Sequence, residues 1–292
     1  MSEENKRLLE RLMRYCAANG DVEQLESLLN QGVNPDAPDK NGYRAIHFAA
    51  LSKSPETVKT LSAHQADLNA LDRFGKTALY FTSVADDVLM ARTLLEQGAD
   101  ANIGDQKGFR PLHIAAKHKN SQMVTALALN GADLSITDKY GQTPLHWAAF
   151  YGDAKVTQAL LNEGAEIDKT NPNGQTALEY AVLAGNIGSA EMLLTFGADM
   201  HLKNSRGKSA VDIAQNKGVA FKALFYEADV LNQVLNESEK ETSKITENTH
   251  TAPAPNVTSQ LEKAGENMDA EKISKNQKNI LTMPKINTNM RG

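Results

Sequence analysis

Three histidines have a spacing that raises the question of metal chemistry. His47, His113 and His146 are separated by multiples of 33 residues, and imidazole nitrogens bind zinc at about 2.0–2.1 Å. If units of 33 residues stack side by side, equivalent positions lie about 8–10 Å apart, which is too far to share one ion. Other units carry Tyr80, Glu179 or Asp212 at this position. We therefore expect no metal site.

Cys16 is the only cysteine and the second candidate for chemistry. A thiol nucleophile needs an adjacent base, but no histidine lies near Cys16 and no CxxC motif includes it. Cys16 shares a helical spacing with Leu9, Leu12 and Met13, so we expect it in a hydrophobic core. A single cysteine excludes an intrachain disulfide and favours a reducing, intracellular location.

Motifs that usually carry catalysis are absent from the sequence. It contains no GxxxxGK[ST] phosphate loop, no HExxH and no GxSxG. The neighbouring carboxylates of Asp86 and Asp87 are expected to be solvated in a surface turn. We expect no enzymatic activity, no cofactor and no small-molecule substrate.

The elements that position these residues repeat with a period of 33. One series of glycines keeps this spacing throughout: Gly42, Gly75, Gly108, Gly141, Gly174 and Gly207. A second series precedes alanine: Gly98, Gly131, Gly164 and Gly197. The most complete unit contains Thr143-Pro144-Leu145-His146 followed by Ala148-Ala149. This motif and this period resemble the ankyrin repeat.

The resemblance implies an all-α solenoid of six to seven stacked helix-turn-helix units with projecting hairpin fingers. We expect capping repeats at 1–38 and at 204–236, the latter with a longer final helix. Five further repeats are expected between them, at 39–71, 72–104, 105–137, 138–170 and 171–203. Charged residues of the first helix, including Arg7, Arg11 and Arg14, should form the solvent-facing side of the first cap. The family also implies that the recurring histidine forms hydrogen bonds between neighbouring units.

Local signals support the predicted turns and helix ends. An Asp or Asn stands three residues before each glycine of the first series, where its side chain can bond to the turn backbone. Thr143-Pro144 is a strong helix start. Units that lack this pair, such as the one with Arg44-Ala45, should have helices weaker by about 0.5–2 kcal/mol. The unit around Gly42 has Gln65 in place of the second glycine and is expected to be the loosest.

Composition changes near residue 237. Residues 237–292 contain no aromatic residue and few aliphatic ones, so a disordered polar tail is expected. This tail is either a solvated linker or carries a short recognition segment such as NILTMPKINTNMRG. The chain has a net charge of −5 and no apolar run of membrane-spanning or signal-peptide length. We expect a monomeric cytoplasmic protein without a membrane span.

Positions that the repeat leaves free define a candidate binding surface on the concave side of the stack. In ankyrin-like arrays these are the finger tips and the two residues after the paired small residues. Here they carry Tyr43, Arg73, Phe74, Lys76, Lys107, Phe109, Lys117, His118, Lys139, Tyr140, Phe150 and Tyr151. Exposed aromatic residues among Lys and Arg are typical of a protein-binding hot spot. Packing of these rings against the next finger is the alternative.

One further position is apolar in every unit and is interpreted as packing: Phe48, Phe81, Ile114, Trp147, Tyr180 and Ile213. The preferred function is a non-catalytic scaffold or adaptor whose protein partner has acidic and apolar surface. Similar arrays occur in eukaryotic regulatory scaffolds and in effectors that intracellular bacteria deliver into host cytoplasm. Alternatively, the tail acts as a modification site or transport signal and the array targets it. Nucleic acid is disfavoured by the negative net charge.

Overall fold

The computed structural model describes residues 2–233, which fold into helices joined by turns without any β-strand in this range. The first helices of successive units are α1 (Glu3–Asn19), α3 (Ala45–Ala49), α5 (Ala78–Val84), α7 (Pro111–Lys117), α9 (Pro144–Tyr151), α11 (Ala177–Ala184) and α13 (Ala210–Ala214). The second helices are α2 (Val22–Asn30), α4 (Pro55–Ala63), α6 (Val88–Glu96), α8 (Ser121–Leu129), α10 (Ala154–Asn162) and α12 (Ile187–Thr195). Residues 219–233 are also helical.

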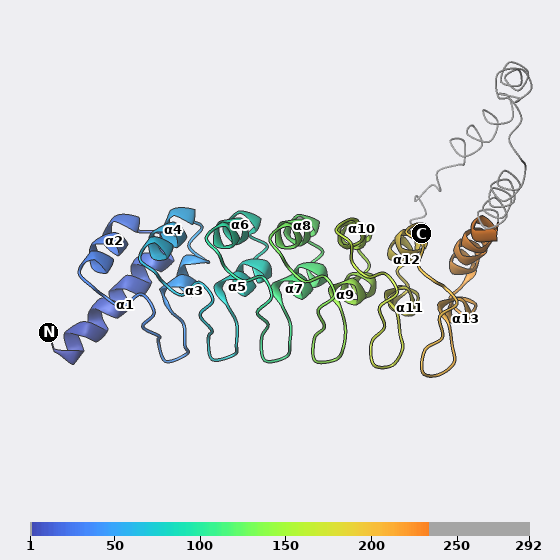
Figure 1. Ribbon diagram of the computed structural model, residues 1–292, viewed down its shortest axis with the longest axis horizontal. Coiled ribbons are helices and arrows are strands. Elements are labelled where there is room, and N and C mark those ends of the chain that lie inside the picture. Colours follow the sequence, from blue (N-terminus) through green and yellow to red (C-terminus); the bar gives the residue numbers. More distant parts are fainter. Residues whose placement is uncertain (1, 234–292) are drawn as a thin grey trace, which may run out of the picture. The chain divides into compact units, whose positions relative to one another are not determined.

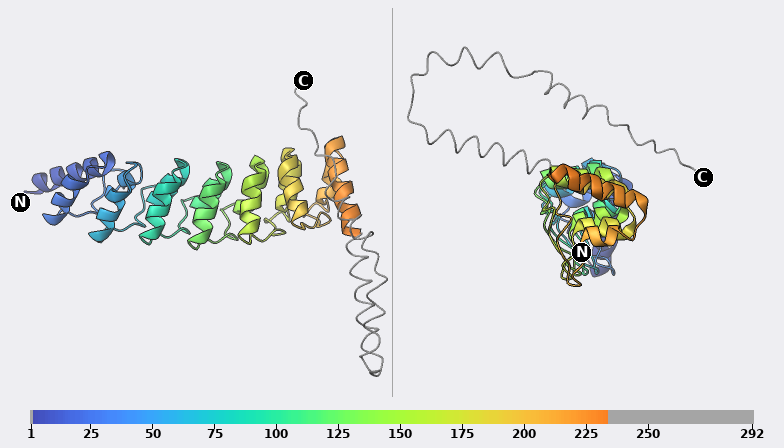
Figure 2. Two further views of the ribbon diagram at one scale, coloured as in Figure 1. Left: turned by 90° about the horizontal axis from the view of Figure 1, so that it is seen from above. Right: turned by 90° about the vertical axis from the view of Figure 1, so that its right-hand side faces the viewer.

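The helices stack in two layers (Figures 1 and 2). Each odd-numbered helix packs on the next odd-numbered one, and α2 to α12 form the second layer in the same way. The loops between units project from one side of the stack as fingers (Figure 1). This arrangement confirms the predicted all-α solenoid of helix-turn-helix units. The tail predicted for 237–292 lies outside the described residues.

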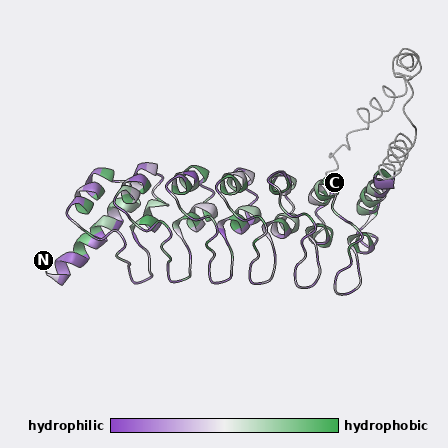
Figure 3. Cartoon of the chain, in the orientation of Figure 1, coloured by the Kyte–Doolittle hydropathy of each residue, from purple (hydrophilic) through white to green (hydrophobic). Residues whose placement is uncertain are grey.

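A continuous core runs through the stack because each unit contributes the same buried side chains. One column consists of leucines 33 residues apart, all buried: Leu28, Leu61, Leu94, Leu127, Leu160 and Leu193. Each such side chain contributes about 1.5–3 kcal/mol on burial. Helices α2 to α13 are too short to be stable alone, with α3 only five residues long. Packing between units therefore stabilises them, and their faces differ in hydropathy accordingly (Figure 3).

Cys16 belongs to this core, as predicted. Its side chain is buried, and its Sγ donates a hydrogen bond to Gln24 Oε1 at 3.4 Å. Burial raises the pKa of the Cys16 thiol, which disfavours the nucleophilic thiolate. None of the helices within residues 2–233 has the length and apolar character needed to cross a bilayer.

Each finger is closed by the predicted side-chain-to-backbone turn. In the fourth finger, Asp138 Oδ1 accepts from the N–H groups of Tyr140 at 2.8 Å and Gln142 at 3.0 Å. The equivalent residues that form the same turn are Asp39, Asp72, Asp105, Asn171 and Asn204. The glycine that follows adopts a positive φ, for example 74° at Gly141.

Backbone hydrogen bonds hold neighbouring fingers together. Lys139 N–H donates to Lys107 O at 3.1 Å, and the equivalent bonds start at Arg73, Gln106 and Ser205. At the same position the fifth finger has Pro172, which has no N–H to donate. Backbone bonds therefore connect the first four fingers to one another and the fifth finger to the sixth, with no such bond between the fourth and the fifth.

Two arginines replace the helix-capping threonine and make bonds that the local pattern did not predict. The guanidinium of Arg44 donates to Asp36 O at 3.0 Å and to Leu71 O at 3.1 Å. Arg110 donates to the equivalent carbonyls of Asn102 and Thr137 at 3.3 and 2.7 Å. Both side chains thus join their own finger to the next one.

Candidate interaction surface

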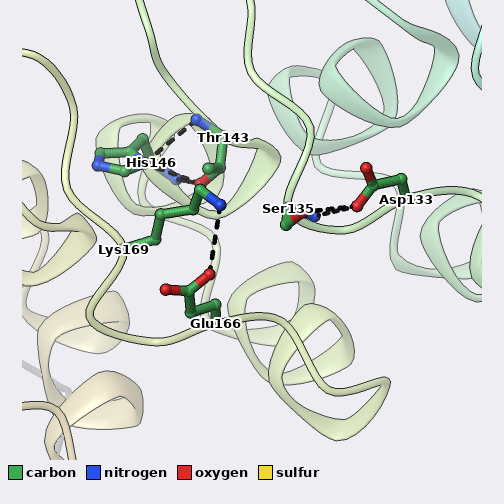
Figure 4. A network of polar contacts seen from close by, with 6 residues as sticks. All are labelled: Asp133, Ser135, Thr143, His146, Glu166 and Lys169. Atoms are coloured by element: carbon green, nitrogen blue, oxygen red, sulfur yellow. Dashed lines mark hydrogen bonds and ion pairs between the residues drawn. The ribbon is translucent and has the colours of Figure 1, made fainter.

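The recurring histidines connect neighbouring units. His146 Nδ1 accepts from Thr143 N–H at 3.2 Å (Figure 4), and Nε2 lies 3.0 Å from Gln175 O in the next unit. Because a carbonyl only accepts, Nε2 carries the proton. The Nε2 atoms of His47 and His113 lie at 3.2 and 3.1 Å from the equivalent carbonyls. The structural role implied by the repeat is confirmed.

Burial keeps these imidazoles neutral. Desolvation lowers the pKa of His47 and His146 and lowers that of His113 to about 4. Between residues 2 and 233, no three His, Cys, Asp or Glu side chains cluster in a way that could hold a metal ion.

Other residues at this position also reach the following finger. Tyr80 Oη donates to Asp105 Oδ2 at 3.3 Å, and Glu179 Oε2 accepts from Asn204 Nδ2 at 2.7 Å. In the first unit, Arg14 Nη1 donates to Ala37 O at 2.8 Å. One repeat position thus connects units with four different side chains, and it holds the fingers as a preorganised platform.

The structure separates the predicted finger-tip aromatics by their position relative to the glycine. Phe74 and Tyr140 directly precede it and are 42% and 54% exposed. Tyr43 directly follows Gly42 and is only partly exposed, with its ring centroid 5.9 Å from Phe48 and 5.8 Å from Phe81. The rings that precede the glycine are thus exposed, whereas Tyr43 packs between units.

Phe109 also follows its glycine and also packs between units. Its ring centroid lies 5.9 Å from that of His113 and 5.2 Å from that of Trp147. Packing, the alternative left open by the sequence, therefore describes Tyr43 and Phe109, while partner binding by the exposed rings stays a prediction.

Cations accompany the exposed rings. Arg73 Cζ lies 4.6 Å from the centroid of Phe74, and Lys139 Nζ lies 5.0 Å from that of Tyr140. Such contacts contribute about 0.5–1 kcal/mol at exposed sites. They also restrict the side chains before any partner arrives, which lowers the entropic cost of binding.

A hollow of about 360 Å³ lies between the second and third fingers. Five of the predicted residues line it, namely Phe74, Lys76, Lys107, Phe109 and Lys117, together with Tyr80. Lys76 Nζ lies 5.0 Å from the Tyr80 ring centroid. The hollow therefore combines aromatic side chains with three lysines and one carboxylate, that of Asp105.

A second aromatic group lies at the end of α9. Tyr151 stacks on Trp147 with centroids 5.8 Å apart, and Phe150 is 46% exposed. Trp147 Nε1 donates to Asp138 Oδ2 at 3.1 Å. The packing role predicted for Trp147 is confirmed, since the indole packs against the core and contacts the rings of Phe109 and Tyr151.

His118 stands apart from both groups. Its Nδ1 lies 3.8 Å from Asp86 Oδ1, a contact that is an ion pair only when the imidazole is protonated. His118 does not line the hollow between the second and third fingers.

Comparisons with known proteins agree with this architecture. A family model described as ankyrin repeats (3 copies) matches residues 12–105 and again residues 112–204. Among solved structures, the chain is similar to the crystal structure of the ankyrin repeat domain of Bcl-3, described as a unique member of the IkappaB protein family. The TM-score is 0.66 at 26% identity, over 69% of this chain and 92% of that one. No curated protein matches the chain.

Proposed function

We propose that this chain, which belongs to the ankyrin repeat family, is a scaffold or adaptor. It binds a partner protein through its concave finger surface. Ankyrin repeats generally mediate protein–protein interaction and are non-catalytic modules. The observation that carries the proposal is the pair of exposed rings, Phe74 and Tyr140, each accompanied by a cation.

The chemistry of this surface defines the partner. Aromatic residues and arginine are enriched where binding energy concentrates. Lys76, Lys107 and Lys117 outnumber the single carboxylate in the lining of the hollow, that of Asp105. The partner should therefore present carboxylates around an apolar side chain that contacts the aromatic rings of the hollow. The central contact therefore pairs an apolar anchor with a ring of opposite charges.

The test compares two double variants of the full chain against one partner identified by capture and then purified. Phe74→Ala/Tyr140→Ala removes two exposed rings from the concave side. Leu89→Ala/Leu129→Ala removes two exposed apolar side chains from the second helices and serves as the matched control. We expect the first variant to weaken binding at least about tenfold, or ~1.4 kcal/mol, and the control to bind like the wild type. Equal affinity of all three proteins would refute the proposal.

We further propose that the protein acts as a monomer in the cytoplasm. The buried, unpaired thiol of Cys16 supports a reducing compartment. Sedimentation of the purified chain tests the monomer. Delivery into a host cell is a separate proposal based on tail composition, and fusion of the chain to a translocation reporter tests it.

A further inference from the structure

A second hollow lies at the N-terminal end of the stack. Helix α1 has 17 residues whereas α9 has eight, and its early turns lie beside the first finger (Figure 1). The hollow between α1 and this finger measures about 740 Å³, against about 360 Å³ for the one between the second and third fingers. It is therefore large enough to admit a peptide segment.

Positive charge gathers on one wall of this hollow. Arg7, Arg11 and Arg14 stand at i, i+4 and i+7, a spacing that places them on one face of α1. Lys40 adds a cation from the first finger. Glu10 and Asp39 also line the hollow, which leaves two positive charges in excess.

These arginines contribute few contacts to the fold within the described part of the chain. Only Arg14 is held in place, through the hydrogen bond that it donates to Ala37 O. Arg7 and Arg11 are exposed, and neither forms an ion pair with any carboxylate in residues 2–233. Like charges at i and i+4 destabilise a helix. Arg7 and Arg11 are thus a pair of like charges without an ion pair in the described residues, with Glu10 and Asp39 as the only carboxylates that line the same hollow.

Aromatic side chains complete the hollow. Tyr15, one residue beyond Arg14, is 68% exposed, and Phe48 is partly buried in the wall formed by α3. A tyrosine beside arginines offers a ring face for apolar contact and a hydroxyl for hydrogen bonding. A fitting ligand therefore combines negative charge with apolar groups.

We propose that this arginine hollow, defined by Arg7, Arg11, Arg14, Tyr15, Lys40 and Phe48, binds an extended acidic segment of a partner protein. Arg7 and Arg11 are separated by about 6 Å along the helix axis. Side chains on one face of an extended chain recur every ~6.6 Å. Carboxylates at alternate positions of the segment thus match the two free guanidinium groups, and the residues between them point to the opposite side, toward Phe48 on α3. Tyr15 lies one turn beyond Arg11 on the same face of α1 and can contact the end of the segment.

Other ligands fit the arrangement less well. A single phosphate group would leave most of the 740 Å³ unfilled. Nucleic acid requires a longer basic track, whereas this one is interrupted by Glu10 and Asp39 in a chain of net charge −5. The segment can belong to a different partner from the one that binds the central fingers, so the inference does not depend on the proposed function.

The experiment measures fluorescence anisotropy of a labelled octapeptide with Glu at alternate positions and Leu between them, added to the full chain at low salt. Its Gln-for-Glu counterpart is the peptide control. Arg7→Gln/Arg11→Gln should raise Kd about tenfold, and Tyr15→Ala should raise it severalfold. Arg92→Gln/Lys155→Gln removes the same charge from exposed positions on the second helices and should leave Kd unchanged.

Several outcomes would overturn the inference. They are failure of the acidic peptide to bind the full chain, equal binding of the Gln counterpart, and equal losses in the two charge variants. Tighter binding of a single-stranded oligonucleotide that is also lost in Arg7→Gln/Arg11→Gln would reassign the hollow to nucleic acid. Since Phe74 and Tyr140 remain intact in these variants, failure here leaves the central surface to be judged by its own test.

Discussion

Glu179 is a buried carboxylate at the position where three other units carry histidine. Its side chain is fully buried, and Oε2 accepts from Asn204 while Oε1 makes no direct hydrogen bond. The side chain of Gln175 also favours the charged carboxylate, but less than burial disfavours it. Within residues 2–233 no cation pairs with it. Burial raises the pKa of the Glu179 carboxyl group. The charged form therefore costs stability at neutral pH.

The substitution Glu179→His should stabilise the protein at pH 7. By analogy with His146, the new imidazole would accept from Thr176 N–H and donate to Lys208 O. Removing an unsatisfied buried charge contributes about 1–3 kcal/mol and the new bond ~1 kcal/mol, while losing the charge-assisted bond from Asn204 costs about 1.5–3 kcal/mol. Asn204 is partly exposed, so water can replace its acceptor. The net expectation is a gain of about 1 kcal/mol.

The pH dependence of this gain gives a sharper test than its size. A raised folded-state pKa means that Glu179 favours the fold below its unfolded pKa and loses that contribution as pH rises through the folded value. A buried histidine behaves in the opposite way, as the lowered pKa of His146 indicates. The advantage of the variant should therefore shrink steadily from about pH 7 to pH 5.

Equilibrium urea unfolding, followed by far-UV circular dichroism and by Trp147 fluorescence, measures these differences. Trp147 lies in α9, which packs on α11, the helix that carries Glu179. Glu179→Gln is the control, since it removes the charge without adding a group that titrates near neutrality. A variant less stable than the wild type at pH 7, or an advantage independent of pH, would refute the reasoning.

Three further predictions concern the same stack. Gly108→Ala should destabilise the protein more than Gly207→Ala, by about 1–3 kcal/mol in urea unfolding. Both glycines have φ above 70°, but only at Gly108 would the new Cβ lie 3.0 Å from a neighbouring backbone atom, Lys139 N; equal losses of stability would contradict this. Gln65→Gly should raise stability by about 0.5–1 kcal/mol, since Gln65 has φ 61° where later units carry glycine, and an unchanged thermal midpoint would count against it. Because the pKa of His113 is lowered to about 4 in the folded protein, its contribution to the free energy of unfolding is complete above its unfolded pKa near 6.5 and is lost as pH falls toward 4. This loss of up to about 3 kcal/mol should be smaller in His113→Gln. Parallel profiles of unfolding free energy against pH for the two proteins would contradict this prediction.

The period of 33 residues predicted the fold because turn chemistry and core packing recur together in each unit. Asp138 and its equivalents close the fingers as expected, and the leucine column is buried throughout. Cys16 and the histidines also occupy the roles assigned to them. These features depend on contacts between residues at a fixed separation along the chain, so the repeat pattern of the sequence can predict them.

The candidate surface was harder to predict from the sequence, because the folded turn determines which way each side chain points. Tyr43 and Phe74 stand on opposite sides of their glycines, and only Phe74 is well exposed. The bond from Arg44 to Leu71 O spans 27 residues, so no local capping rule includes it. Likewise, the hollow between α1 and the first finger forms from segments that are apart in sequence.

Photo-crosslinking tests most directly whether a partner protein sits on the concave finger surface. A photoreactive phenylalanine analogue would replace Phe74 in one full-length protein and Leu89, exposed on α6, in another. After irradiation with the captured partner, we expect a covalent adduct from position 74 and none from position 89. An adduct from position 89 alone would contradict this expectation.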